Sequence, residues 1–126
     1  MATMYPENRI PGEKEVLSKA VKNIAFRLNL SQKELSEILG TSRSEISRVF
    51  ANTAYISPAT KIGECALLLI RVYRDLGSLL GDDPSLHQEW FKNYNEHLHG
   101  YPIELSKTIT GLVSVVSYLD TMRGYA

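Results

Sequence analysis

The chain has 126 residues, and its 14 lysines and arginines balance its 14 aspartates and glutamates. Hydrophobic residues make up 44% and charged residues 22%, which excludes collagen-like, coiled-coil-only and intrinsically disordered chains. The neutral total argues against a protein that coats nucleic acid by bulk electrostatic attraction, but it is compatible with a local basic patch. The length predicts one domain, or two small ones that share a helix.

The chain begins with a segment that predicts a loose arm followed by a helix. Residues 1–12 contain two prolines and a glycine and lack the apolar core of a signal peptide. From Glu13, apolar residues recur at intervals of three and four, so we expect a helix with one buried face. The residues expected to point inward are Val16, Leu17, Ala20, Val21, Ile24, Ala25 and Leu28.

Two short helices are predicted next, separated by a tight turn. Ser31 and Glu34 match a capping box that begins the first of them, and Gly40 is typical of a helix end. Ser42 and Glu45 match a second capping box only two residues later. This arrangement is typical of a helix-turn-helix. The expected inward residues are Leu35, Ile38, Leu39, Ile46, Val49 and Phe50.

The rest of the chain is also predicted to be helical. Ser57 and Pro58 indicate the start of a long helix, and the Gly81–Pro84 segment indicates a stop, a turn and a restart. Valines near residue 115 also favour a strand, but no second strand is available for pairing, so the predicted fold class is all-α. The predicted helices span residues 57–80, 84–94, a short stretch from 102, and 110–122.

Charge and cysteine content add two constraints. Residues 1–56 contain eight basic and six acidic residues, a net charge of +2, so the remainder carries −2. The single cysteine, Cys65, cannot form an internal disulfide or a multi-thiolate zinc site, and we expect a buried thiol. Its apolar run, residues 65–70, is far shorter than the roughly 20 residues that span a membrane. The sequence therefore predicts a cytoplasmic protein without a membrane association.

The amino-acid sequence of the helix-turn-helix segment is specific enough to indicate a class of protein. Residues 30–49 read Leu-Ser-Gln-Lys-Glu-Leu-Ser-Glu-Ile-Leu-Gly-Thr-Ser-Arg-Ser-Glu-Ile-Ser-Arg-Val, and the stretch 14–56 resembles the DNA-binding half of Xre-type repressors. The exposed face of the third helix should enter the major groove, where Arg donates two hydrogen bonds to guanine and Ser suits either base. Glu45 should face away from phosphate or act purely as a cap. The expected base contacts are Arg43, Ser44, Ser47 and Arg48, and the expected phosphate contacts are Ser31, Gln32 and Lys33.

Several short motifs indicate what kind of domain the C-terminal half forms. The motifs are Trp90-Phe91, the segment Asn95-Glu96-His97-Leu98-His99-Gly100-Tyr101-Pro102-Ile103-Glu104-Leu105, Gly111, and the tail Arg123-Gly124-Tyr125-Ala126. Together they resemble the toxin-binding domain of Xre/MbcA/ParS-type antitoxins over roughly residues 60–126. The resemblance implies a type II antitoxin that neutralises a RES-domain, NAD-degrading toxin and binds operator DNA to autoregulate its operon. It also implies that the tail Arg123, Gly124, Tyr125 and Ala126 helps to block the toxin's active-site cleft.

The domain organisation and partners follow from the two resemblances. We expect a flexible arm (1–12), a helix-turn-helix DNA-binding domain (13–56) and a helical toxin-binding and dimerisation domain (57–126). One helix-turn-helix contacts few bases, so useful affinity for double-stranded operator DNA should need a homodimer that reads two half-sites. The alternative is a free-standing Xre-family transcriptional regulator whose C-terminal half only dimerises or senses a ligand.

Enzymatic and metal-binding functions are not expected. Two histidines separated by one residue point to opposite sides of a regular element, and the sequence shows no fixed carboxylate ligand beside them. No phosphate-binding glycine loop and no nucleophile–base motif is present, and Asp82-Asp83 is typical of a helix cap. We therefore predict a protein that is not an enzyme and holds no cofactor. The residues considered for a metal site are His87, Glu89, His97 and His99.

Overall fold

The computed structural model describes residues 12–124, which form seven α-helices and no β-strand, so the all-α prediction is confirmed. An isolated bridge pairs Asn95 with Gly100. No helix in this range has the length and apolar character needed to cross a bilayer. The helices are α1 (Glu13–Arg27), α2 (Gln32–Leu39), α3 (Arg43–Phe50), α4 (Lys61–Leu80), α5 (Pro84–Lys92), α6 (Pro102–Leu105) and α7 (Ile109–Met122).

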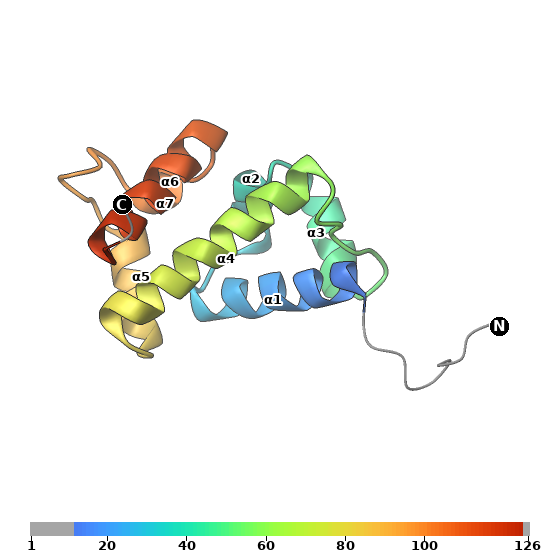
Figure 1. Cartoon of the computed structure of the whole chain (residues 1–126). Coiled ribbons are helices and arrows are strands. Elements are labelled where there is room, and N and C mark those ends of the chain that lie inside the picture. The colour runs from blue at the N-terminus through green and yellow to red at the C-terminus, as the bar shows by residue number, and fades with distance from the viewer. Residues whose placement is uncertain (1–11, 125–126) are drawn as a thin grey trace.

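Helix α4 joins the two halves of the molecule. It packs against α1 and α2 on one side and against α5 and α7 on the other. Figure 1 shows α4 running diagonally between the α1–α3 group and the α5–α7 group, with α3 and the C-terminal end of α7 at opposite ends of the molecule. Buried apolar side chains from both groups form one continuous core. Its fully buried members include Leu28, Leu35, Leu69, Leu112 and Leu119.

The start of α4 differs from the prediction. Ser57 and Pro58 do not begin the helix, because the N-cap is Thr60, whose Oγ1 accepts a hydrogen bond of 3.0 Å from the backbone N–H of Gly63. The residues from 57 to 60 form a turn instead, closed by a 2.7 Å hydrogen bond from the Thr60 hydroxyl to the Ser57 carbonyl. A Cβ at Gly63 would lie 2.0 Å from that carbonyl oxygen, so only glycine lets the turn pack on the helix. Helix α5 also ends slightly early, at Lys92.

The buried face of α1 is rotated relative to the predicted one. Val16 was expected to point inward, but 56% of its surface is exposed, and Ala20 is only half-buried. Ser18 is buried instead, and its Oγ accepts a 2.8 Å hydrogen bond from the backbone N–H of Ile56. This bond satisfies the buried N–H of the segment that leads to α4, which explains why a polar residue occupies the inner face.

A polar seam holds the C-terminal half against the end of α1 and against α2. At its centre, Arg27 donates through Nε to the Tyr73 hydroxyl at 2.9 Å and through NH2 to the Asp82 carbonyl at 3.1 Å. The remaining seam contacts are Gln88 Nε2 to the Arg27 carbonyl (2.8 Å), Lys92 Nζ to the Asn29 carbonyl (2.6 Å) and the Lys107–Glu37 ion pair (3.0 Å). The continuous core and this seam make the described chain one packed unit.

Candidate DNA-binding face and toxin-binding module

Local hydrogen bonds shape the helix-turn-helix. The predicted capping box at the start of α2 is confirmed: Ser31 Oγ accepts from the Glu34 N–H at 3.0 Å, and the Glu34 carboxylate accepts from the Ser31 N–H at 2.9 Å. Helix α2 ends at Gly40, which has φ +75° in the left-handed region that glycine adopts most readily. The turn then passes through Thr41 to Ser42, the N-cap of α3. The inward residues of both helices are buried as predicted, apart from Phe50, which is half-buried.

The outer face of α3 presents the expected base-contacting residues. Arg43, Ser44, Ser47 and Arg48 are all exposed. The Ser47 hydroxyl donates a 3.0 Å hydrogen bond to Oε1 of Gln32, the first residue of α2. This bond brings the start of α2 and the face of α3 together, which is the relation needed for one helix to contact phosphate while the other enters the groove.

The second predicted capping box is only half formed. Ser42 Oγ accepts a 3.0 Å hydrogen bond from the Glu45 N–H, but the Glu45 carboxylate does not return the bond to the cap. It accepts instead from Arg48 NH2 at 2.8 Å, one turn along α3. Of the two roles predicted for Glu45, acting purely as a cap is excluded by this ion pair, and facing away from phosphate stays a prediction. A guanidinium already paired to a carboxylate would have to exchange partners before it could bind phosphate or guanine.

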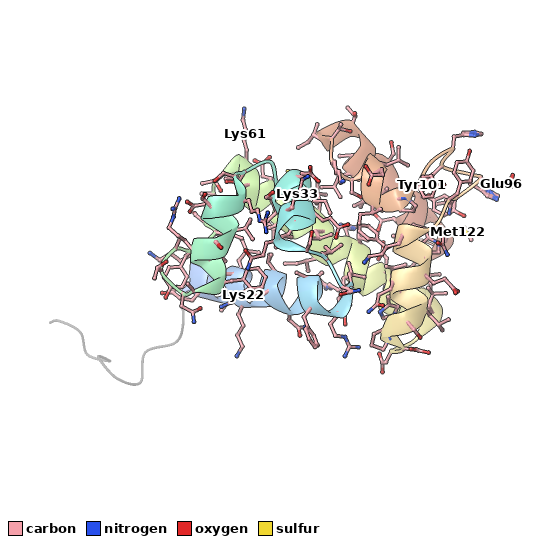
Figure 2. All side chains as sticks on the ribbon, turned by 180° about the vertical axis from the view of Figure 1, so that it is seen from behind. Lys22, Lys33, Lys61, Glu96, Tyr101 and Met122 are labelled. Carbon is pink, nitrogen blue, oxygen red and sulfur yellow. The ribbon has the colours of Figure 1, made fainter. Side chains whose placement is uncertain are left out.

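The start of α2 retains donors for phosphate. Ser31 uses its hydroxyl oxygen as an acceptor in the cap, so the hydroxyl proton is still available, while Lys33 is exposed. On the neighbouring α1, Lys22 Nζ donates a 2.5 Å hydrogen bond to Oδ1 of Asn52, a residue just beyond the end of α3. Figure 2 shows Lys22 and Lys33 on the helix-turn-helix side, and Glu96, Tyr101 and Met122 on the opposite side of the molecule.

The loop between α5 and α6 is held by its own side chains and rings. Asn95 Oδ1 accepts a 2.9 Å hydrogen bond from the Leu98 N–H, and the Asn95–Gly100 bridge closes the loop. An Asn side chain that accepts from a nearby backbone N–H is a contact typical of turns. Of three ring contacts here, His97–Tyr118 attaches the loop to α7, Trp90–Tyr118 joins α5 to α7, and Tyr94–Tyr101 lies within the loop. The Tyr118 ring stacks against Trp90 and His97, and Tyr94 meets Tyr101 edge to face.

The histidines considered for a metal site occupy separate environments. His87 is buried, its Nε2 lies 2.6 Å from the Gly81 carbonyl, and its ring meets Tyr73 edge to face. His97 stacks on Tyr118, and His99 has a positive φ of 55° in the loop. Across residues 12–124, no three His, Cys, Asp or Glu side chains gather as metal ligands would. Cys65 is buried as predicted, and burial, with a smaller contribution from Glu64, raises the pKa of its thiol.

The start of the C-terminal tail is held by an ion pair. Arg123 NH1 donates a 2.6 Å hydrogen bond to Oδ1 of Asp75, which is completely buried in α4. A second pair, Arg71 Nε to Asp120 Oδ1 at 3.0 Å, lies one turn earlier on both helices. Gly124 follows with φ +96°, a positive value that glycine adopts readily. Tyr125 and Ala126, the other two predicted tail residues, lie outside the described residues.

The two carboxyl groups of this cluster are coupled. Burial, together with a hydrogen bond shared with Asp120, raises the pKa of Asp75 above its ordinary value, and this outweighs the opposing effect of Arg123. Burial also acts to raise the pKa of Asp120, but its hydrogen bonds with Asp75 and Arg71 outweigh this and lower it. Oδ2 of Asp75 accepts no hydrogen bond from the described residues. The coupling therefore favours the protonated form of Asp75 and the ionised form of Asp120, each relative to an isolated carboxyl group.

A shallow pocket of about 540 Å³ opens over this cluster. Sequence reasoning identified Arg123 but missed the other members. The available signal was Asp75 itself, which lies three and six residues after Val72 and Leu69 and therefore on the inner face of an apolar helix. An ionisable residue at such a position needs a partner, but the sequence does not indicate which one. The residues that line the pocket are Leu67, Arg71, Arg74, Asp75 and Arg123.

Comparison with known proteins divides the chain at the same helix that joins its two halves. Residues 12–71 match the family model of the antitoxin Xre-like helix-turn-helix domain. Residues 75–124 match the antitoxin Xre/MbcA/ParS C-terminal toxin-binding domain. A search of curated proteins gave no significant match. The two matched segments cover nearly all of the described chain, with the exposed α3 face in one and the Asp75–Arg123 cluster in the other, and the chain belongs to the Xre-type antitoxins.

Proposed function

We propose that this antitoxin neutralises a RES-domain, NAD-degrading toxin through its C-terminal half and, as a homodimer, binds operator DNA to repress its own operon. The observation that carries the proposal is the presence of both family domains on one packed chain. Their candidate contact surfaces, α3 and the end of α7, lie at opposite ends of the molecule, so one chain has room for both partners (Figure 1).

On the DNA side, Arg43, Ser44, Ser47 and Arg48 contact bases, and Ser31, Gln32 and Lys33 contact phosphates. The support is their exposure and the Ser47–Gln32 bond that aligns α3 with the start of α2. The affinity should fall with salt because phosphate contacts release counterions. Replacing Lys33 with Ala should weaken binding to all sequences and reduce the salt slope by about 1.

On the toxin side, the tail Arg123, Gly124, Tyr125 and Ala126 enters the toxin's active-site cleft. The supporting features are the ion pair that fixes Arg123 and the left-handed Gly124, which together set where the tail leaves the domain.

The test is co-expression with the neighbouring gene, scored by growth rescue and co-purification, combined with gel-shift binding to the operon's promoter DNA. The double variant Arg43→Ala/Ser44→Ala should lose promoter binding and still rescue growth. Deletion of residues 123–126 should weaken rescue and leave promoter binding intact. Arg74→Ala, which removes an exposed arginine of α4, is the matched control for the promoter-binding measurement alone. Full neutralisation by the tail deletion would exclude the insertion of the tail.

A chain that binds the promoter but neither rescues growth nor co-purifies with the neighbouring protein would favour the free-standing regulator. The same outcome would leave the DNA-binding half of the proposal intact. The two functions are therefore separable in a single set of strains.

A further inference from the structure

We propose that the pocket over the Asp75–Arg123 cluster is a docking site for an acidic side chain of the partner toxin, with Arg74 as the receiving group. This inference rests on the proposed function, because it assigns a contact chemistry to the toxin-binding half. The pocket residues Asp75 and Arg123 both lie within the segment that matches the toxin-binding domain.

The first argument is the local charge. Three arginines, Arg71, Arg74 and Arg123, line or border the pocket, against the two carboxyl groups of Asp75 and Asp120. The positive charge is in excess even when both carboxyl groups are ionised. The pocket is therefore a basic site on a half of the chain that carries a net charge of −2. Such a reversal of the local charge sign favours an anionic partner.

The second argument is the state of Arg74. The carboxyl groups of Asp75 and Asp120 already pair with Arg123 and Arg71 at 2.6 and 3.0 Å. Arg74 is exposed and makes no hydrogen bond or ion pair with another described residue. A guanidinium presents parallel N–H donors that match a carboxylate in two simultaneous hydrogen bonds, so Arg74 offers an unused fork at the rim of the pocket.

The third argument concerns the kind of anion. The carboxyl group of Asp75 lines the pocket, and that of Asp120 pairs with the lining residue Arg71, so both oppose a multiply charged phosphate more strongly than a singly charged carboxylate. Leu67, which is 48% exposed, forms an apolar edge beside the arginines. An apolar edge next to a charged fork suits an aspartate or glutamate carried on a protein surface better than a free ion.

The experiment measures the affinity of the purified full-length antitoxin for the toxin encoded beside it, by calorimetry at low and at high salt. Arg74→Glu should weaken binding at least tenfold, because it places like charges opposite each other, and Arg74→Ala should weaken it less. Lys19→Glu makes the same charge change on the outer face of α1 and should leave the affinity within about twofold. The difference between Arg74→Glu and wild type should shrink at high salt.

Charge reversal of acidic residues on the toxin should identify one variant that restores binding to Arg74→Glu. Phosphate should compete no better than chloride at matched ionic strength; stronger competition would assign the pocket to a phosphate and overturn the proposal. Equal affinity of wild type and Arg74→Glu would also overturn it, while leaving toxin binding itself established. If wild type does not bind the toxin at all, the proposed function fails, and this inference fails with it.

Discussion

The two halves of the molecule bury different kinds of polar side chain. In the helix-turn-helix half, the buried polar side chains Ser18 and Ser36 each make a hydrogen bond with a backbone group. In the C-terminal half, Asp75 and His87 are ionisable, and each has one side-chain atom without a hydrogen-bond partner in residues 12–124. The exposed face of α3 therefore lies over buried neutral side chains, although Oε1 of Glu15 in α1 is also buried without a hydrogen-bond partner among the described residues. The candidate toxin surface instead lies over the buried carboxyl group of Asp75, whose raised pKa links stability to pH.

The largest expected effect tests whether the two halves are one folding unit. A Cβ at Gly111 would lie 1.9 Å from the Leu105 carbonyl oxygen, and one at Gly63 would lie 2.0 Å from that of Ser57. Replacing either glycine with Ala should destabilise the protein by about 2–3 kcal/mol, because backbone must move. Circular dichroism reports all helices, and fluorescence of Trp90, the single tryptophan, reports the C-terminal half. The two transitions should coincide in both variants, and separate midpoints would contradict one shared core.

The next prediction concerns the ionisable interior. Because the pKa of Asp75 is raised above 3.8 in the folded chain, the folded state holds its proton more tightly than the unfolded state. The free energy of unfolding should therefore fall as the pH rises from about 3.8 through the raised pKa, by at most about 1.4 kcal/mol per pH unit. Asp75→Asn should flatten this slope in urea titrations, whereas Asp82→Asn, at an exposed position, should not. A slope that survives in Asp75→Asn would assign the pH dependence to other groups.

A smaller effect is expected on the DNA side. Glu45→Gln removes the carboxylate that holds Arg48 and removes a negative charge close to the phosphates. Promoter affinity should rise by about threefold at low salt, an effect of the size of one exposed ion pair. Glu64→Gln, which removes an exposed carboxylate on α4, serves as the control and should change the affinity little. Unchanged or weaker binding by Glu45→Gln would mean that Arg48 does not contact DNA.

The smallest effect is a gain in stability. Gly77 lies inside α4 with a helical backbone, and an added Cβ would meet no atom within 4 Å. Gly77→Ala should therefore stabilise the chain by about 0.5 kcal/mol, because the unfolded state loses freedom. Since α4 belongs to both halves, the thermal midpoints from circular dichroism and from Trp90 should rise together. A rise in only one of the two midpoints would show that the halves unfold separately.

Local signals in the sequence predicted much of the fold. Helix caps such as Ser31 and Asp83, and the stop at Gly40, act within three or four residues, so pattern and spacing reveal them. The same reasoning failed at Ser57, because the true N-cap, Thr60, is selected by packing of the turn against Gly63. Local patterns are silent about contacts between residues that the fold brings together.

The two candidate sites also differ in how well the sequence predicts them. The α3 face follows from helical spacing, because its exposed residues are those that remain when Ile46 and Val49 point inward. The cluster beneath the tail joins residues 48 or 49 positions apart, such as Asp75 with Arg123. Neither residue alone indicates the other. The role of Arg48 was also incompletely predicted, because its pairing with Glu45 depends on side-chain conformation and not on spacing alone.

Because helix α4 is shared by both halves, a mutation that shortens the protein is expected to affect both halves. Residues 72–80 of α4 carry Val72, Asp75 and Leu76, which are buried and contribute to the core or to the cluster beneath the tail. A frameshift or truncation after the helix-turn-helix would therefore remove part of the interior as well as the toxin-binding module. The truncated product would be expected to unfold and not to survive as a separate repressor. The proposed neutralisation and the proposed repression would then be lost together through a single mutation.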